Sequence, residues 1–208
     1  MTEPAPGPEQ PQLYLLTPPV FELSTYPDIL ARVLDAQDVA CLRLALATHD
    51  VDRIARAADA CRAVAHARDV AIVVSDHSSL AERLGLDGVH LSDAGKSVRD
   101  ARKVLGPDAI VGSFCSTSRH DGLMAGEAGA DYIAFGPLTA LNADDHATAE
   151  LFQWWSDVVE VPVVAEGALS TSIVERLAPY TDFFGIGEEI WEAEDPVAAL
   201  KEMTAPLA

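Results

Sequence analysis

The chain has 208 residues, of which 49% are hydrophobic and 23% charged, so we expect one domain with a full core. Its formal net charge of -19 repels nucleic acids and anionic membrane surfaces and argues against binding to either. Three cysteines lack CxxC spacing, and neither a basic leader nor an apolar run of 18 residues is present. These features predict a soluble, cytoplasmic protein with reduced thiols.

Residues 1–11 are rich in Pro, Glu and Gly and are expected to be a disordered lead-in to a domain at 12–208. Beyond them, short apolar runs alternate with amphipathic stretches. The apolar runs predict eight strands, at residues 12–17, 39–46, 71–74, 88–91, 110–114, 132–135, 161–165 and 183–186. The stretches between them predict helices, at residues 27–36, 50–68, 78–84, 97–105, about 118–128, 148–155, 171–177 and from 196 onward. The longest loop is expected at 138–146.

The stretch Gly129 to Pro137 shows the pattern that the whole chain repeats. A helix ends at a glycine, a run buried on both faces follows, and Gly136-Pro137 turns the chain into a loop. Eight such units predict a single-domain α/β fold, the (β/α)8 TIM barrel, whose chemistry lies in the loops after the strands. An open doubly wound sheet would place a glycine-rich turn after the first strand, where this chain has Pro18-Pro19.

Four segments in this order resemble the thiamine phosphate synthase and thiazole tautomerase family: Leu13 to Thr17, Asp87 to Leu91, Gly129 to Pro137, and Val161 to Val164. The resemblance covers nearly the whole chain after Gln12. It implies a barrel of thiamine biosynthesis that joins a pyrimidine pyrophosphate to a thiazole phosphate. Pyrophosphate leaves with the help of Mg²⁺, and a pyrimidine carbocation forms on the way. Such a site must hold two anions with Lys, Arg, Mg²⁺ and backbone donors.

The resemblance assigns only part of that site to this chain. It implies that substrate or phosphate is bound by residues that follow or end strands, namely Arg43, Ser75, Gly136, Gly167 and Gly187. It implies Mg²⁺ on Asp76, and Asp93, which precedes the matching position by two residues, is the expected second ligand. No catalytic residue is assigned.

Other family positions are lost. The residues that stand at them are Ala45 for a lysine, Gly95 for a metal ligand, Phe114 for a serine, Asp144 for the phosphate-binding lysine, Ala168 for a glycine, Glu188 for a serine and Pro137 for the tautomerase's histidine. The expected mouth therefore combines many acids with few bases, the acids being Asp76, Asp93, Asp144, Asp145, Glu166, Glu188 and Glu189 and the bases Arg43 and Lys96. A carboxylate about 4 Å from a phosphate oxygen is repelled by roughly 4 kcal/mol at an effective dielectric of about 20.

Two functions remain open on this evidence. The first is a thiamine phosphate synthase-like transferase that has lost phosphate contacts and does not make thiamine phosphate at a normal rate. The second is a non-catalytic, ligand-binding or regulatory barrel for a cationic thiamine-related compound. Either would have a small, thiamine-precursor-like molecule as its partner. Whether the protein is a homodimer is also left open, because Trp154, Trp155 and Trp191 predict either helix packing or a dimer patch.

Several single residues have competing interpretations. Arg43 is either a ligand-binding cation or the partner of a buried ion pair with Asp76 or Glu166. Asp76 is either a site residue or a helix cap. His90 is expected to be a core or rim histidine bonded to backbone, and His146 a surface residue or, with Asp144 or Asp145, a metal ligand. Cys41 and Cys115 are expected to be small core residues.

Overall fold

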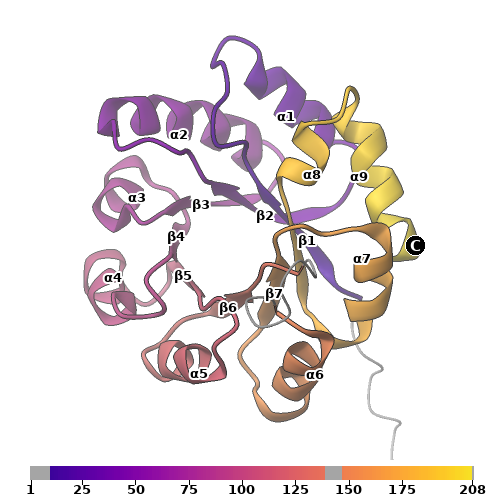
Figure 1. Cartoon of the computed structure of the whole chain (residues 1–208). Coiled ribbons are helices and arrows are strands. Elements are labelled where there is room, and N and C mark those ends of the chain that lie inside the picture. Colours follow the sequence, from indigo (N-terminus) through magenta and orange to yellow (C-terminus); the bar gives the residue numbers. More distant parts are fainter. Residues whose placement is uncertain (1–9, 139–146, 208) are drawn as a thin grey trace, which may run out of the picture.

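The computed structural model describes residues 10–138 and 147–207. Parallel strands close a barrel in the order β1 to β8, and the helices form a ring around it (Figure 1). This is the predicted (β/α)8 fold. The strands are β1 Gln12–Leu16, β2 Val39–Leu44, β3 Ala71–Ser75, β4 Gly88–Leu91, β5 Ile110–Phe114, β6 Tyr132–Phe135, β7 Val163–Glu166 and β8 Phe183–Ile186.

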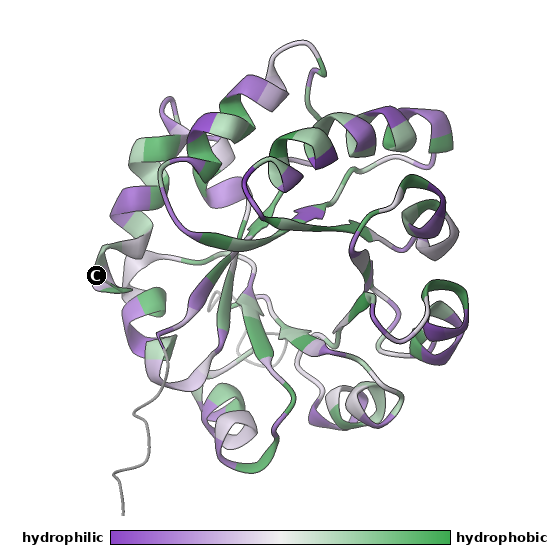
Figure 2. Ribbon diagram, turned by 180° about the vertical axis from the view of Figure 1, so that it is seen from behind, coloured by the Kyte–Doolittle hydropathy of each residue, from purple (hydrophilic) through white to green (hydrophobic). Residues whose placement is uncertain are grey.

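The outer helices follow the strands in sequence. They are α1 Tyr26–Leu34, α2 Val51–His66, α3 Ser78–Leu84, α4 Val98–Leu105, α5 Arg119–Glu127, α6 Ala149–Val158, α7 Thr171–Leu177, α8 Glu188–Trp191 and α9 Pro196–Thr204. Figure 2 shows hydrophobic residues along the strands and residues of both kinds along the helices, as expected of helices with one face on the barrel. Side-chain caps begin several of them, such as Asp50 on α2 and Asp195 on α9.

The structure corrects the sequence prediction at two places near the end of the chain. The seventh strand begins at Val163 rather than Val161, because Pro162 has no N–H to donate and the Val161 carbonyl accepts from Trp155 Nε1 at 2.8 Å. A short helix, α8, follows β8 where only a loop was expected. The predicted loop at 138–146 lies outside the described residues except for Leu138, and so does the lead-in up to residue 9.

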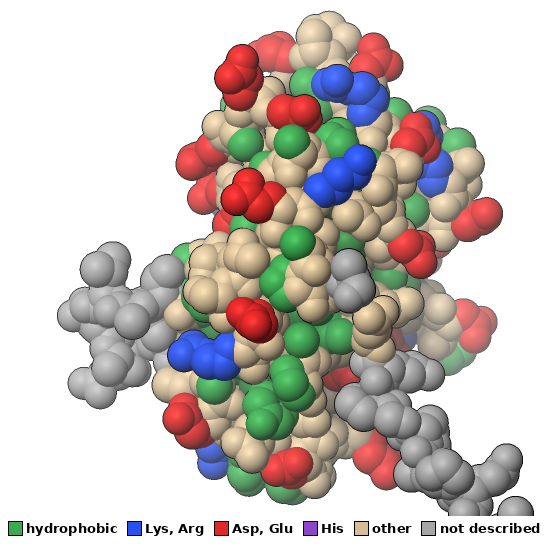
Figure 3. All heavy atoms as spheres, turned by 90° about the vertical axis from the view of Figure 1, so that its right-hand side faces the viewer, with side chains coloured by type: hydrophobic (Ala, Val, Ile, Leu, Met, Phe, Trp, Pro, Cys, Tyr) green, Lys and Arg blue, Asp and Glu red, His purple; other side chains and the backbone are tan. Residues whose placement is uncertain are grey.

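The outer surface carries the acidic excess of the chain. On the face in Figure 3, Asp and Glu side chains are scattered among Lys and Arg rather than gathered in one patch. In the described part of the chain, no helix is both long and apolar enough to cross a membrane.

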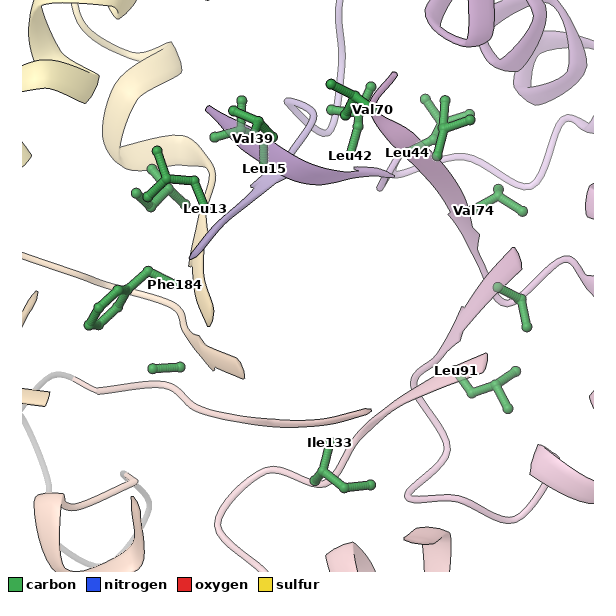
Figure 4. Packing of buried hydrophobic residues seen from close by; sticks show 14 of the residues in the cluster. Leu13, Leu15, Val39, Leu42, Leu44, Val70, Val74, Leu91, Ile133 and Phe184 are labelled. Atoms are coloured by element: carbon green, nitrogen blue, oxygen red, sulfur yellow. The ribbon is translucent and has the colours of Figure 1, made fainter. Parts of the chain in front are cut away.

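Strand residues alternate between two cores. Those that point outward, such as Leu15, Leu42 and Phe184, pack beneath the helices (Figure 4). Those that point inward form a smaller cluster inside the barrel, which includes Tyr14 and Tyr132. Alternation with a period of two is what parallel strands between a barrel interior and a helix layer require. It also places Arg43, His90 and Glu166 on the inside.

Aspartates tie the lower ends of neighbouring strands together. Asp87, Asp131 and Asp182 are the residues directly before β4, β6 and β8. Each carboxylate accepts an N–H from the first or second residue of the preceding strand, at 2.7 Å from Ile72, 2.7 Å from Val111 and 2.8 Å from Val163. The same aspartates donate their own N–H to the carbonyls of those residues. The start of three strand pairs is thereby fixed opposite the mouth.

Candidate functional site

Arg43 is the central charged residue of the barrel interior. It is the fifth residue of β2 and is 7% exposed. Its Nη1 and Nη2 donate to Glu166 Oε2 and Oε1 at 2.9 and 3.2 Å, which makes a two-pronged ion pair across the barrel. Of the two carboxylates predicted as ion-pair partners, the structure selects Glu166 over Asp76. Glu166, which was expected as a free carboxylate at the mouth, therefore neutralises Arg43 inside the barrel.

His90 links this ion pair to two tyrosines. Its Nε2 lies 2.6 Å from Arg43 Nη1, and its Nδ1 lies 2.9 Å from the Tyr132 hydroxyl. A guanidinium only donates, so Nε2 must accept and the imidazole proton sits on Nδ1. The Tyr132 hydroxyl accepts a hydrogen bond from Nδ1–H and is free to donate its own hydrogen to the Tyr14 hydroxyl, 2.6 Å away. The prediction of a buried histidine is confirmed, but its partners are side chains rather than backbone.

The network holds each of its members in one protonation state. Burial lowers the pKa of His90 well below its usual value, and the charge of Arg43 lowers it further. Burial raises the pKa of Tyr14 well above 10 and also raises that of Tyr132. Burial lowers the pKa of Arg43, but Glu166 and the tyrosines more than offset this and raise it overall. The histidine is therefore neutral, the tyrosines keep their protons and Arg43 stays charged.

Glycines make room for these side chains. A Cβ on Gly112 of β5 would lie 1.9 Å from the Tyr132 ring. A Cβ on Gly185 of β8 would lie 2.8 Å from the Cβ of Glu166, and one on Gly136 would lie 2.0 Å from its carbonyl oxygen. Gly136 is predicted to bind phosphate, and in the structure its lack of a side chain is also needed for packing against β7.

Asp76 and Ser75 lie at the rim of the barrel, at the C-terminal end of β3. Asp76 is exposed, has a φ of 59°, and accepts from Ser92 through both oxygens, at 2.8 Å from its N–H and 2.7 Å from its hydroxyl. It does not cap α3, since His77 holds that position. Asp76 and Ser75 line a cavity of about 400 Å³ between the loops after β2 and β3, and Arg43 is not among the lining residues.

Asp93 is the other predicted metal ligand. Its Oδ2 accepts from the Ser97 hydroxyl, and its Oδ1 is buried with no hydrogen-bond partner in the described structure. Within residues 10–138 and 147–207 no group of three or more His, Cys, Asp or Glu side chains could hold a metal ion. Mg²⁺ commonly binds to one or two carboxylates and keeps waters and substrate oxygens as its other ligands. Asp76, an exposed residue whose two oxygens accept from Ser92, and Asp93, whose buried Oδ1 has no partner in the described residues, are the candidates for that smaller requirement.

Gly167 and Gly187 lie on the loops after β7 and β8, with the short helix α8 between β8 and α9. They help to line a cavity of about 210 Å³ with Leu16, Thr17, Pro19, Ala45, Ala168, Gly185, Glu188 and Glu189. No Lys or Arg is among these residues. Glu188 is exposed, whereas Glu189 turns back onto the loops and accepts from the N–H of Gly187 at 2.8 Å and of Leu169 at 3.0 Å.

Apart from Gly136 and Asp93, the predicted site residues lie in three places in the structure. Arg43 and Glu166 meet inside the barrel, Asp76 and Ser75 lie over β3, and Gly167 and Gly187 lie over β7 and β8. Asp144, Asp145 and His146 lie outside the described residues. Sequence reasoning missed the roles of Tyr14, Tyr132 and Ser92, although the period-two alternation was enough to place both tyrosines inside the barrel.

The fold is a (β/α)8 barrel, a class of protein whose sites lie at the C-terminal ends of the strands. A sequence profile for the family described as thiamine monophosphate synthase matches residues 13–181. The chain belongs to this family, as the resemblance of its segments implied. The interpretation as a thiamine phosphate synthase-like protein of thiamine biosynthesis is confirmed at that level.

Individual relatives agree with the family. Thiamine-phosphate synthase of Rhodospirillum centenum is 39% identical over 92% of this chain and 95% of its own length. The protein of the same name from Hyphomonas neptunium is 37% identical over 99% and 97%. Among solved structures, thiamine phosphate pyrophosphorylase from Pyrococcus furiosus has a TM-score of 0.79 at 22% identity and covers 94% of this chain and 95% of its own. That last likeness supports the fold.

Proposed function

We propose that this barrel binds a thiamine-precursor-like molecule at its mouth but condenses a pyrimidine pyrophosphate with a thiazole phosphate far more slowly than its relatives named thiamine-phosphate synthase. The observation that carries the proposal is the ion pair of Arg43 with Glu166. Arg43 is the one cation that the resemblance assigns to phosphate binding, and it is buried and already neutralised. A pyrophosphate would have to displace a bidentate carboxylate to reach it.

The charge around the mouth supports the same conclusion. Because Glu166 is neutralised by Arg43, repulsion of a phosphate comes from other carboxylates, above all Asp76, Glu188 and Glu189. One carboxylate about 4 Å from a phosphate oxygen costs roughly 4 kcal/mol at an effective dielectric of about 20. Ala45 and Phe114 add no compensating positive charge. Two anions held side by side would therefore receive less stabilisation here than a diphosphate site needs.

Mg²⁺ is the cofactor proposed for this mouth, with Asp76 as its first ligand and Asp93 Oδ1 as its second. When bound, the ion would neutralise charge on a phosphate oxygen. The buried, unpaired Oδ1 of Asp93 and the exposure of Asp76 support this assignment. Mg²⁺ alone should raise the melting temperature of the wild type but not of Asp76→Asn, and an equal shift in both proteins would remove Asp76 from the site.

A second candidate function is binding without catalysis. It is favoured by the cavity over β7 and β8, which has Glu188 and Glu189 but no Lys or Arg in its lining. Such a cavity suits a cationic thiamine-related compound.

The proposed location is the cytoplasm, since all three cysteines are unpaired and buried. Trp155 is a buried residue of α6 and Trp191 donates to the Leu16 carbonyl, so these two rings serve helix packing. A homodimer is proposed as well.

The synthase reaction tests the first candidate. Purified protein and the Rhodospirillum centenum relative are assayed side by side with both phosphorylated substrates and Mg²⁺. We expect turnover at least about 100-fold lower for this chain, which corresponds to roughly 2.7 kcal/mol of lost transition-state stabilisation. Comparable turnover would refute the proposal. Thermal shift with thiamine separates the candidates, because stabilisation by thiamine but not by Mg²⁺ with pyrophosphate favours the binding function.

A further inference from the structure

The loops after β7 and β8 present two main-chain donors to one point. One is the N–H of Gly187, which lies between β8 and α8, and the other is the N–H of Leu169 in the loop after β7. We call these two groups the amide pair. In (β/α)8 barrels the loops after the seventh and eighth strands frequently bind phosphate through such donors. The anion that meets the amide pair here is the carboxylate of Glu189.

Both oxygens of that carboxylate are engaged. Oε2 accepts from Gly187 at 2.8 Å and Oε1 accepts from Leu169 at 3.0 Å, so each donor has a charged acceptor at normal hydrogen-bond length. Leu169 and Gly187 are buried and Glu189 is half-buried. The packing of α8 favours this position, because Trp191 Nε1 donates to the Leu16 carbonyl at 2.6 Å and Ile190 is fully buried.

We propose that Glu189 is a specificity-determining residue that takes the place of a ligand phosphate on the amide pair. The neighbouring 210 Å³ cavity then accepts a ligand end without phosphate, such as a hydroxyl group. A phosphate that approached the amide pair would compete with a tethered carboxylate and meet its charge. The inference rests on the proposed function only in placing the ligand at the mouth. It adds that the cavity beside the loops after β7 and β8 excludes a phosphate group of that ligand.

Inorganic phosphate is the probe, and the amide signals of Gly187 and Leu169 in ¹⁵N NMR spectra are the readout. In the wild type we expect no saturable shift of either signal. In Glu189→Ala the amide pair is vacated, and we expect phosphate to shift both signals saturably over the concentration range that gives no saturation in the wild type. Glu188→Gln is the matched control, since it removes the same charge from the same cavity and leaves the amide pair occupied.

The outcomes separate this inference from the proposed function. Saturable shifts in the wild type would overturn it, as would a Glu189→Ala protein that binds phosphate no better than Glu188→Gln. If Glu189→Ala does not fold, the wild-type titration and Glu189→Gln still decide, because the glutamine keeps the size of the side chain but removes its charge and should bind phosphate more tightly. Normal synthase turnover with no phosphate on the amide pair would refute the proposed function alone.

Discussion

At the scale of residues, the ion pair in the barrel is the strongest electrostatic feature. Arg43 and Glu166 are both 7% exposed, so removal of one partner leaves an uncompensated buried charge. Glu166→Gln should therefore lower the free energy of unfolding by about 3–5 kcal/mol. Urea denaturation monitored by circular dichroism measures the change.

Asp100→Asn provides the control for that variant. It removes the partner of Lys103 in an exposed pair, 2.7 Å long, on the outer face of α4. We expect no measurable change in stability, because exposed pairs are screened by solvent. If Glu166→Gln were as stable as Asp100→Asn, the buried pair would not have the structural role assigned to it.

His90 gives the protein a pH dependence of predictable sign. Its folded-state pKa lies below the unfolded value of about 6.5, so between the two values the unfolded chain binds more protons. The contribution of neutral His90 to the free energy of unfolding is complete above about pH 6.5 and is lost as the pH falls toward the folded-state pKa. One such proton changes stability by at most about 1.4 kcal/mol per pH unit.

The comparison that isolates His90 uses urea denaturation between pH 7 and pH 5. The wild type should lose stability more steeply than His90→Asn, whose amide cannot take up a proton. Identical slopes would mean that His90 is not the group that titrates.

At the scale of elements, the aspartates opposite the mouth fix the strand register. Asp182 accepts the N–H of Val163 at 2.8 Å and donates its own N–H to the Val163 carbonyl. Asp182→Ala removes the side-chain acceptor and should destabilise the fold by about 1–3 kcal/mol, because the strand N–H loses a charged partner. Chemical denaturation provides the measurement.

Asp108→Ala is the matched substitution, since Asp108 is exposed and makes no hydrogen bond within the described structure. It should leave the unfolding midpoint unchanged. Equal effects from both variants would assign the loss at Asp182 to charge rather than to the strand contact.

The ability of sequence to predict these elements follows from their physics. Runs such as 88–91, 110–114 and 132–135 were predicted at their observed bounds, since burial on both faces leaves a continuous apolar signal. The start of β7 was wrong because Val161 continues the apolar run although Pro162 cannot join the ladder. Helix α8 is one turn long and has too few residues to show a helical period.

The site was less predictable than the fold, and for a different reason. Sequence placed Arg43 in a barrel strand and Glu166 at the mouth, and offered their pairing as one of two choices for Arg43. Which partner is correct depends on the register of strands far apart in sequence. The contact of Glu189 with the N–H groups of Leu169 and Gly187 could not be predicted locally either, because these two donors are 18 residues apart on different loops.

 The role of Glu189 appears only once the loop after β7, with the Leu169 N–H, is packed beside α8.

At the scale of the whole molecule, the net charge of -19 opposes compactness. Acidic side chains are spread over the surface, as the face in Figure 3 illustrates, so their repulsion is long-ranged and screened by salt. Raising NaCl from about 20 to about 200 mM should raise the melting temperature, because the Debye length falls from about 20 Å to below 10 Å. Differential scanning calorimetry gives the answer, and a melting temperature that falls with NaCl would show that attractive surface pairs dominate instead.

The central claim is that the mouth cannot hold a diphosphate, since Arg43 is neutralised by Glu166 and the amide pair is occupied by Glu189. Isothermal titration of the wild-type protein with pyrophosphate and excess Mg²⁺ tests it most directly. We predict a dissociation constant weaker than about 0.1 mM, which corresponds to less than roughly 5.5 kcal/mol of binding free energy. A tighter constant that is weakened by Arg43→Ala would contradict the claim.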